Sequence, residues 1–576
     1  MTRLELTDRG RLFLSEAAGK IFPMNILMLY PKFPETFWNT ARSVKLLWGC
    51  KGIMPPLGLL TIASYLPDDF SVRLHDRNIA EEPEADWAWA DAVFVSAMVA
   101  QREDYSECIA AAKRHGKPIA LGGPITHALP GKACADADWI CFGEAENIIA
   151  ELLSDLRADR RGKQYHGGSE TNMEVVRVPR FELLPRINDY VTMALQFSRG
   201  CPFKCEFCDI IEIYGRVPRT KTPQQVCAEL ETLTRLGFSG YIFLVDDNFI
   251  GNKRKAKAML SQLAVWNRAH GSPYRYYTEA SINLADDDEL MKGMFEAGFF
   301  HVFIGIETPD PRLLKITQKM QNVPGDPLRK IAAIREHGLL VTAGFIVGFD
   351  GEDRSVFELQ KQFIQTSGIG IAMIGLLQAI PHTQLWRRLK SEGRLLEALN
   401  VNGNLTLEGV NFIPRGEMTK REYLARYGDL VRSVYDPAAY FARTVPALLA
   451  LKAEGVSSRL GKDIWTVVRV ILKEFYYFGV RSQDLRARFW KGFFKILWQN
   501  PAALEAFVFE VSVFHHLHSH AGYVARAVGA YLSSPDSADV LDQCIPDGIL
   551  KPPVRKSSPE ASAPGDSPHA AGGAPL

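Results

Sequence analysis

Three cysteines crowded into one short segment constrain the fold of this chain more than any other feature. Residues 196–208 read Gln-Phe-Ser-Arg-Gly-Cys-Pro-Phe-Lys-Cys-Glu-Phe-Cys, so Cys201, Cys205 and Cys208 follow a Cys-x3-Cys-x2-Cys spacing. Thiolates are soft ligands, and a short loop with Gly and Pro can wrap three of them around an iron–sulfur cluster. Zinc is the alternative, but a zinc site normally has a fourth Cys or His nearby, and none follows before Cys227 in a helical stretch. The spacing therefore predicts an iron–sulfur site.

Cysteine usage and charge indicate where the protein works and what it binds. Nine cysteines are spread over 576 residues without the pattern of a disulfide framework, so we expect reduced thiols and a cytoplasmic protein. Residues 1–23 lack the apolar run of a secretory signal and read as a loose extension, and we expect no transmembrane helix. The 67 Lys and Arg nearly cancel the 66 Asp and Glu, which excludes a broad electrostatic footprint for nucleic acid or acidic membrane and favours a small-molecule partner.

Residues 24–160 alternate continuous apolar runs with helical stretches. Runs such as NILMLYP, AVFVSAMVA and PIALGGP are typical of strands buried on both faces. The sequence therefore predicts a doubly wound, Rossmann-like α/β domain, which binds ligands beyond the carboxyl ends of its strands. The aromatic segment 30–38 after the first run is either a loop over the ligand or a connection packed on the core.

The strand ends of this first domain resemble those of cobalamin-binding Rossmann-like domains. Ser96-Ala97-Met98 is similar to their Ser-x-Leu element, and Gly122-Gly123 is similar to their Gly-Gly element. The resemblance implies that Ser96, Gly122 and Gly123 lie against bound cobalamin. The Asp-x-His-x-x-Gly motif that supplies a histidine to cobalt is absent, and His75 does not match it, so we expect cobalamin without a histidine ligand.

Residues 190–395, after a predicted linker at 161–189, repeat strand and helix in the rhythm of a (β/α) barrel. The predicted strands YIFLVDDNF, YRYYTEASI, HVFIGIET, LVTAGFIVGF and AMIGLLQAIP are separated by helices at 223–236, 254–269 and 285–297. Because barrel chemistry sits at the carboxyl ends of strands, the acids there are candidate ligand groups. Helix capping is the structural alternative for them, more so for Asp246 and Asp247 than for Glu279 and Glu307.

The cysteine spacing, with an aromatic residue before the last Cys, resembles the signature of the radical S-adenosylmethionine (SAM) superfamily. The resemblance implies a partial (β/α)6 barrel and a [4Fe–4S] cluster whose fourth iron is chelated by SAM. Gly305-Ile306-Glu307 is similar to the family's Gly-Ile-Glu strand. The implied SAM-binding residues are Asp247, Glu279, Glu307, Gly344 and Gly348.

The remainder of the chain divides into a helical domain and a tail. Residues 396–548 predict a mainly helical C-terminal domain, with helices at 418–435, 461–477, 484–497 and 501–513. Four histidines, His515, His516, His518 and His520, favour a hydrated helix end, with a metal site as the alternative. Residues 549–576 are rich in Pro, Ala, Ser and Gly and predict a disordered tail.

This domain order resembles the cobalamin-dependent radical SAM enzymes, in particular the class B methyltransferases and the branch that includes hopanoid C-2 methylases. The resemblance implies that a 5′-deoxyadenosyl radical activates an unactivated carbon, which then receives a methyl group from methylcobalamin. It also implies a small, lipid-like substrate and an electron donor such as flavodoxin or ferredoxin. The cofactors carry the hard steps, so we expect no catalytic side chain beyond them.

Three alternatives stay open at the level of sequence. The same cofactors support a non-methylating rearrangement or cyclisation in other members of the family. The first domain could also belong to a radical SAM enzyme that has lost cobalamin. A cobalamin-sensing regulatory protein is the third, although a sensor has no need for three clustered thiols.

Replacing Cys201, Cys205 and Cys208 together with Ala removes every thiolate of the predicted site. After anaerobic reconstitution, we expect the wild-type chain to show the broad visible absorption of an iron–sulfur cluster and the triple variant to lack it. Iron analysis of both proteins checks the result. A triple variant that retained the wild-type iron content would contradict the assignment.

Overall fold

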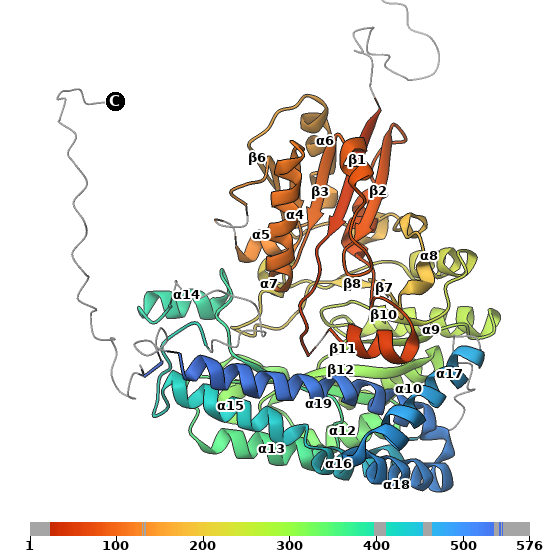
Figure 1. Cartoon of the computed structure of the whole chain (residues 1–576), viewed down its shortest axis with the longest axis vertical. Coiled ribbons are helices and arrows are strands. Elements are labelled where there is room, and N and C mark those ends of the chain that lie inside the picture. The colour runs from red at the N-terminus through yellow and green to blue at the C-terminus, as the bar shows by residue number, and fades with distance from the viewer. Residues whose placement is uncertain are drawn as a thin grey trace, which may run out of the picture.

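The computed structural model describes residues 23–37, 39–129, 131, 134–396, 410–452, 464–534, 541–542 and 544. The predicted loose extension, apart from residue 23, and the predicted tail at 549–576 lie outside these residues. Two six-stranded parallel sheets and a helical region account for the described chain (Figure 1).

The first sheet has the strand order β2-β1-β3-β4-β5-β6, with all pairs parallel. Its strands are β1 (Met24–Tyr30), β2 (Phe70–Asp76), β3 (Ala92–Ser96), β4 (Ile119–Gly122), β5 (Trp139–Phe142) and β6 (Lys163–His166). The sixth strand lies in the segment predicted to be a linker. The sheet confirms the doubly wound α/β fold, while the domain boundaries stay predictions.

Strand β1 shows why this sheet is covered on both faces. Ile26 and Met28 belong to one buried cluster, whereas the alternate residues Leu27 and Leu29 belong to another. Since successive side chains of a strand point to opposite faces, a continuous apolar run requires helices on each side. The first cluster includes α2 (Leu57–Ala63) and α6 (Ile149–Arg157), and the second includes α3 (Glu84–Trp89), α4 (Arg102–Arg114) and α5 (Pro124–Ala128).

The second sheet is the predicted partial barrel, with parallel strands in the order β14-β13-β12-β11-β10-β7. Its strands are β7 (Thr192–Leu195), β10 (Tyr241–Leu244), β11 (Arg275–Ala280), β12 (Phe299–Glu307), β13 (Leu340–Val347) and β14 (Ala372–Leu376). The intervening helices are α8 (Pro223–Arg235), α9 (Lys253–Ala269), α10 (Asp288–Ala297), α11 (Pro311–Ile316), α12 (Pro327–Glu336) and α13 (Ser355–Ser367), followed by α14 (Gln384–Ser391). The two edge strands, β7 and β14, do not pair with each other in this order, so the barrel is open along one side.

A helical region follows the barrel, as predicted, but two of its helices differ from the prediction. It contains α15 (Lys420–Val434), α16 (Pro437–Leu449), α17 (Ile464–Glu474), a π-helical turn η9 (Phe475–Arg481), α18 (Gln483–Gln499) and α19 (Leu504–Leu532). Helix α16 was not predicted, and α19 is far longer than the expected helix at 501–513. None of the helices described is both long and apolar enough to cross a membrane.

The histidines of α19 are not at a hydrated helix end, and that expectation is wrong. His516 and His520 are buried, and Nε2 of His516 donates a hydrogen bond to the carbonyl of Thr36 at 2.7 Å. The His520 ring packs edge-on against Phe37 with ring centroids 4.6 Å apart. No three His, Cys, Asp or Glu side chains within the described ranges converge on a single metal ion. His516 and His520 instead attach α19 to the segment after β1, which is packed on this helix.

Arg443 of α16 joins the helical region to the barrel. It is buried, and its guanidinium donates to the carbonyls of Ile369, Val434 and Gly370 at 2.8, 2.6 and 3.2 Å. The group also lies over the ring of Tyr440, 5.0 Å from its centroid. One side chain thus satisfies three backbone acceptors where α16 meets the segment before β14.

Replacing Arg443 with Met leaves these buried carbonyls without their donor. We expect the free energy of unfolding to fall by about 3 kcal/mol, because each unsatisfied buried acceptor is costly. Urea denaturation followed by circular dichroism measures the change. The matched control is Arg432→Met on α15, where the arginine pairs with Asp429 and both side chains are about 70% exposed. Equal stability of the two variants would contradict the role given to Arg443.

Candidate functional site

The three cysteines lie on a loop that short local structure holds in place. The loop follows the two-residue strand β8 (Ser198–Arg199), which pairs with β9 (Arg219–Thr220), and it ends at the short helix α7 (Ile210–Ile213). Gly200 begins it with φ +90°, and a Cβ there would lie 3.0–3.1 Å from three backbone oxygens. Only glycine fits this turn without strain.

All three thiols are free, and their surroundings suit cluster ligands. Burial raises the pKa of Cys201 and Cys208, so ligation has to displace their protons. Two amides approach the sulfurs: Asn248 Nδ2 lies 4.0 Å from Cys201 Sγ, and Gln321 Nε2 lies 3.5 Å from Cys205 Sγ. Such donors stabilise negative charge on sulfur and tune the potential of a cluster. The donor set therefore fits a [4Fe–4S] cluster, whose three protein thiolates bind three different irons.

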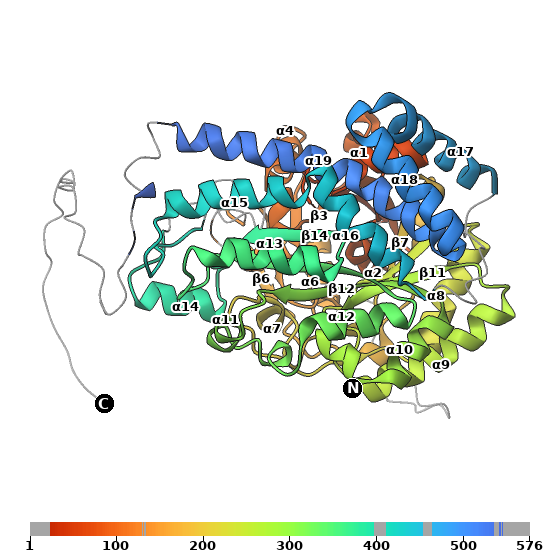
Figure 2. The same ribbon diagram turned by 90° about the horizontal axis from the view of Figure 1, so that it is seen from below.

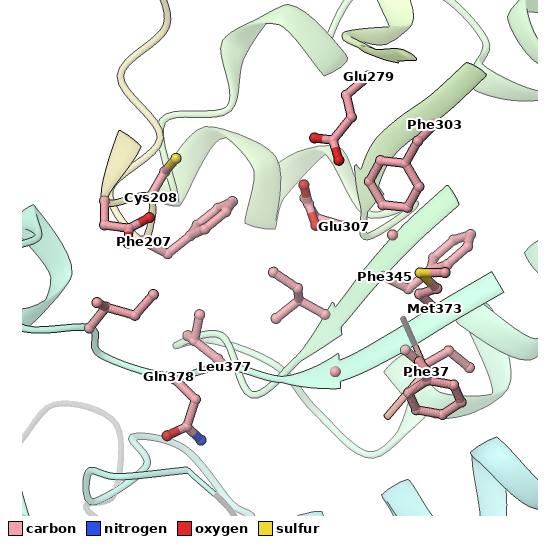
Figure 3. A pocket seen from close by; sticks show the side chains of 16 residues that line it. Phe37, Phe207, Cys208, Glu279, Phe303, Glu307, Phe345, Met373, Leu377 and Gln378 are labelled. Carbon is pink, nitrogen blue, oxygen red and sulfur yellow. The ribbon is translucent and has the colours of Figure 1, made fainter. Parts of the chain in front are cut away.

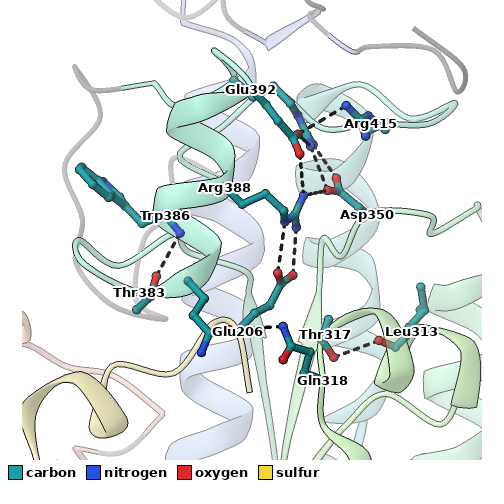
Figure 4. A network of polar contacts seen from close by, with 12 residues as sticks. Glu206, Leu313, Thr317, Gln318, Asp350, Thr383, Trp386, Arg388, Glu392 and Arg415 are labelled. Carbon is teal, nitrogen blue, oxygen red and sulfur yellow. Dashed lines mark hydrogen bonds and ion pairs between the residues drawn. The ribbon is translucent and has the colours of Figure 1, made fainter. Parts of the chain in front are cut away.

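A network of ion pairs clamps the cysteine loop to the far end of the barrel (Figure 4). Glu206, between Cys205 and Cys208, accepts from Nη2 and Nε of Arg388 at 2.9 and 3.2 Å. Arg388 also donates to Asp350, 2.8 Å away, which in turn pairs with the fully buried Arg394. Arg388 lies on α14, and Asp350 follows β13, so two distant segments hold one loop. The sequence carries no local signal for this clamp.

A cavity of about 310 Å³ opens beside the cysteine loop at the carboxyl ends of β11 to β14. Figure 3 shows the carboxylates of Glu279 and Glu307 pointing toward each other across it, with Phe207 and Cys208 on the side of the loop. Its sixteen lining residues are Phe37, Phe207, Cys208, Asp209, Glu279, Phe303, Glu307, Gly344, Phe345, Ile346, Met373, Ile374, Gly375, Leu377, Gln378 and Ile380. Three sequence-predicted SAM residues, Glu279, Glu307 and Gly344, thus meet in one place beside a predicted cluster ligand.

Glu307 ends β12 with φ +64°, an unusual conformation for a residue other than glycine. Its carboxylate pairs with Nζ of Lys319, 2.5 Å away, in a largely buried contact. Gly305 makes room for this pair, because a Cβ there would lie 2.5 Å from Glu307 Oε1 and 2.8 Å from Lys319 Nζ. The Gly-x-Glu spacing therefore has a steric reason. Lys319 itself was missed, because no sequence pattern marks a lysine in the turn after α11.

Glu279 is the acid that is free to receive a cationic ligand. Burial first, and then the nearby carboxylates of Asp247, Asp246 and Glu307, raise its pKa to about 8, although Lys319 acts in the opposite direction. A bound ammonium or sulfonium group would relieve both effects and favour the charged carboxylate. The cavity therefore fits the SAM that the sequence resemblance implies.

Asp246 and Asp247 serve the cysteine loop rather than the cavity. Asp246 accepts from the backbone N–H groups of Phe197 and Ser198 at 2.8 and 2.9 Å and from the Ser198 hydroxyl at 2.7 Å. Asp247 accepts from the N–H of Gly200 at 3.0 Å. Neither residue lines the cavity, and neither makes the helix cap that the structural alternative expected, because both hold the backbone at residues 197–200.

The two glycines near the end of β13 also differ from each other. Gly344 lines the cavity, and a Cβ there would meet the ring of Phe303 at 2.9 Å. Gly348 lies outside the lining, in a turn with φ +111° that is fixed when its N–H donates to Glu352 at 2.7 Å. Its contribution is therefore to the shape of the turn.

Ser96 and the two glycines meet at the carboxyl edge of the first sheet. Ser96 ends β3 beside Gly122 of β4, and a Cβ on Gly123 would lie 2.6 Å from the Ser96 hydroxyl. Around Gly122 only Cys141 lies within 4 Å of a Cβ, so this side of the edge is open. Such an edge fits the backbone approach that a cobalamin nucleotide tail requires. His75 is engaged elsewhere, since its Nε2 lies 2.5 Å from Asp86.

A second cavity of about 280 Å³ lies deeper in the barrel and was not predicted. It shares Glu279, Phe303 and Met373 with the first cavity, so these residues stand at the junction of the two. Its walls come from all six barrel strands, from the segment at 40–48, which contains α1 (Ala41–Ser43) and the π-helical turn η1 (Val44–Trp48), and from α19. Helix α19 and η1 thus cover the open side of the barrel.

Replacing Arg388 with Ala removes the partner of Glu206 and releases one side of the cysteine loop. We expect iron retained per chain after reconstitution to fall several-fold, because a buried carboxylate that loses its partner destabilises the loop. Iron analysis and circular dichroism separate loss of cluster from loss of fold. Arg329→Ala on α12 is the matched control, since Arg329 is 90% exposed and its ion pair is with Asp326 at the start of the same helix. Full iron retention in Arg388→Ala would show that the clamp is dispensable.

Comparison with known proteins places both sheets in described families. Residues 49–153 match the B12 binding domain, residues 195–360 match the radical SAM superfamily, and residues 383–529 match a domain of unknown function. An uncharacterized methyltransferase of Synechocystis is 38% identical over 92% of this chain and 98% of its own length. The hopanoid C-2 methylase of Rhodopseudomonas palustris is 34% identical over 87% of this chain and 94% of its own length.

The fold is also similar to that of OxsB, a cobalamin-dependent S-adenosylmethionine radical enzyme. The TM-score is 0.55 at 14% identity, with 89% of this chain and 82% of that chain covered. The relatives favour methylation over rearrangement, cyclisation or cobalamin sensing. With two relatives above 30% identity over nearly their whole length, the chain belongs to the cobalamin-dependent radical SAM methyltransferases, whose cofactors are a [4Fe–4S] cluster, SAM and cobalamin.

Proposed function

We propose that this enzyme methylates an unactivated carbon of an apolar, lipid-like polycyclic substrate. The observation that carries the proposal is the deep cavity, which is lined mainly by aromatic and aliphatic side chains and joins the cavity beside the cysteine loop. The similarity to a hopanoid C-2 methylase supports the same class of substrate.

The polar groups in the wall of the deep cavity are largely uncharged at neutral pH. Burial lowers the pKa of His301 to about 4 and raises that of Tyr277 to about 12. His301 also forms a short hydrogen bond with Thr342, so one polar atom of each is satisfied within the wall. A cavity of this kind favours hydrocarbon over charged ligands, because an ion would lose its hydration there.

We assign roles to the site residues on the same basis. Cys201, Cys205 and Cys208 would hold the cluster; Glu279, Gly344 and the Glu307–Lys319 pair would bind and orient SAM; and Ser96, Gly122 and Gly123 would hold cobalamin. When bound, these cofactors supply a radical that activates carbon and a methyl group for transfer. Asp247 and Gly348 would position the loops around them, and Phe303 and Met373 would fix the distance between substrate and SAM.

We also propose that the enzyme works in the cytoplasm. None of the nine cysteines, all of which the structure describes, forms a disulfide, which supports a reducing cytoplasm. We also propose a flavodoxin or ferredoxin as electron donor, and the domain boundaries 24–160, 190–395 and 396–548.

Replacing Val513 of α19 with Trp fills the deep cavity without touching the residues assigned to the cofactors. In anaerobic assays with methyl-labelled SAM and a lipid extract, we expect labelled lipid to fall at least about tenfold while reductive cleavage of SAM persists. Val265→Trp, at an exposed site on α9, is the matched control and should leave both products unchanged. Absence of labelled lipid with the wild-type enzyme would refute the substrate class, and unchanged labelling in Val513→Trp would refute the cavity.

A further inference from the structure

Large apolar side chains gather on the surface of α17, η9 and α18. Trp498 is 90% exposed, an extreme value for tryptophan. The members of this set, which we call the apolar patch, are Val468, Leu472, Tyr476, Val480, Phe494, Leu497 and Trp498. No comparable run of exposed apolar residues occurs elsewhere in the described chain.

The patch is not a core surface that was left uncovered by poor packing. The same helices bury Phe478, Phe489 and Ile496 almost completely on their inner faces. Leu472, Tyr476 and Val480 recur at intervals of four, which brings them to one outer side of the helical segment. These helices therefore have one apolar face that packs on the protein and a second apolar face that is exposed and available to a binding partner.

Exposed basic residues lie on the same helices as the patch. Between residues 464 and 500 the acids are Glu474, which is fully buried, and Asp484, against seven Lys and Arg. In the described part of the chain, no acidic group pairs with the four basic residues of α18, which are Arg486, Arg488, Lys491 and Lys495. An aromatic, aliphatic surface with exposed cations on the same helices complements an anionic bilayer, where tryptophan and tyrosine lie at the level of the headgroups.

The patch helices also form part of the shell around the deep cavity. Lys473 of α17 donates from Nζ to the carbonyl of Leu46 in η1 at 2.8 Å. Val44 and Trp48 of η1 line the cavity, as do Phe509 and Val513 of α19. Figure 2 shows α17 and α18 beside α1, at the same end of α19. The apolar patch therefore lies outside the wall that separates the cavity from its surroundings.

An electron donor is a poorer match for this surface. Electrons have to reach the cysteine loop, which leads into α7, and Figures 1 and 2 both show α7 and α14 on the other side of the molecule from α17 and α18. An electron donor bound at the apolar patch would therefore lie far from the cysteine loop.

We propose that α17, η9 and α18 dock the enzyme on an anionic lipid bilayer and bring the wall of the deep cavity to the source of its apolar substrate. The route of the substrate rests on the proposed function, whereas the docking itself does not.

Co-sedimentation with vesicles tests the docking on the full-length enzyme. The probes are phosphatidylcholine vesicles with and without phosphatidylglycerol, and binding is measured without turnover. We expect binding only to the anionic vesicles, weakened by high salt. Phe494→Glu/Trp498→Glu should lower the partition coefficient about tenfold or more, and Lys491→Glu/Lys495→Glu about tenfold.

Two controls carry matched changes at exposed sites away from the patch. Val265→Glu/Leu359→Glu introduces two acids at exposed apolar sites on α9 and α13, and Lys292→Glu/Lys361→Glu reverses two exposed charges on α10 and α13. Both should bind like the wild type, and circular dichroism should be the same for all variants.

Equal binding to neutral vesicles, or wild-type binding by both patch variants, would overturn the proposal. So would a dimer in light scattering that Trp498→Glu disrupts in the absence of vesicle binding, since the patch would then be an interface between two copies. A wild-type enzyme that methylates detergent-dispersed lipid but does not bind anionic vesicles would overturn the docking alone. Normal docking without any methylation would overturn the proposed function alone.

Discussion

The open side of the barrel is the constraint around which the rest of this enzyme is arranged. Six parallel strands end in two unpaired edges, β7 and β14, and expose the barrel interior between them. A closed barrel would fill that interior with its own side chains, as eight-stranded barrels do. Here α19 and η1 cover it instead, and a cavity persists beneath them. The helical region is thus part of the active enzyme.

The sequence predicted what depends on local pattern. Buried parallel strands are continuous apolar runs, so both sheets and their helices were visible, and the cysteine spacing identified the cluster loop before any fold was known. Glu279, Glu307 and Gly344 could be predicted to lie together because parallel strands bring their carboxyl ends to one edge, and all three line one cavity. These are regularities of short segments.

What sequence could not predict depends on contacts between distant segments. The Glu206–Arg388 pair joins residues 182 positions apart, and nothing near either one marks the other. The length of α19 was missed because its histidines look polar, whereas tertiary packing buries two of them against the segment after β1. Likewise Asp246 and Asp247 are adjacent acids at a strand end, and only their backbone partners show that they hold a loop.

Helix α19 contacts two different parts of the molecule, the segment after β1 and the deep cavity. Its middle is tied to Thr36 and Phe37, a few residues beyond the first strand of the cobalamin-type sheet, while Phe509 and Val513 line the deep cavity. A movement of α19 away from the barrel would therefore pull on the segment that leads back to β1. The wall of the deep cavity and the first sheet are in this way mechanically coupled through one helix.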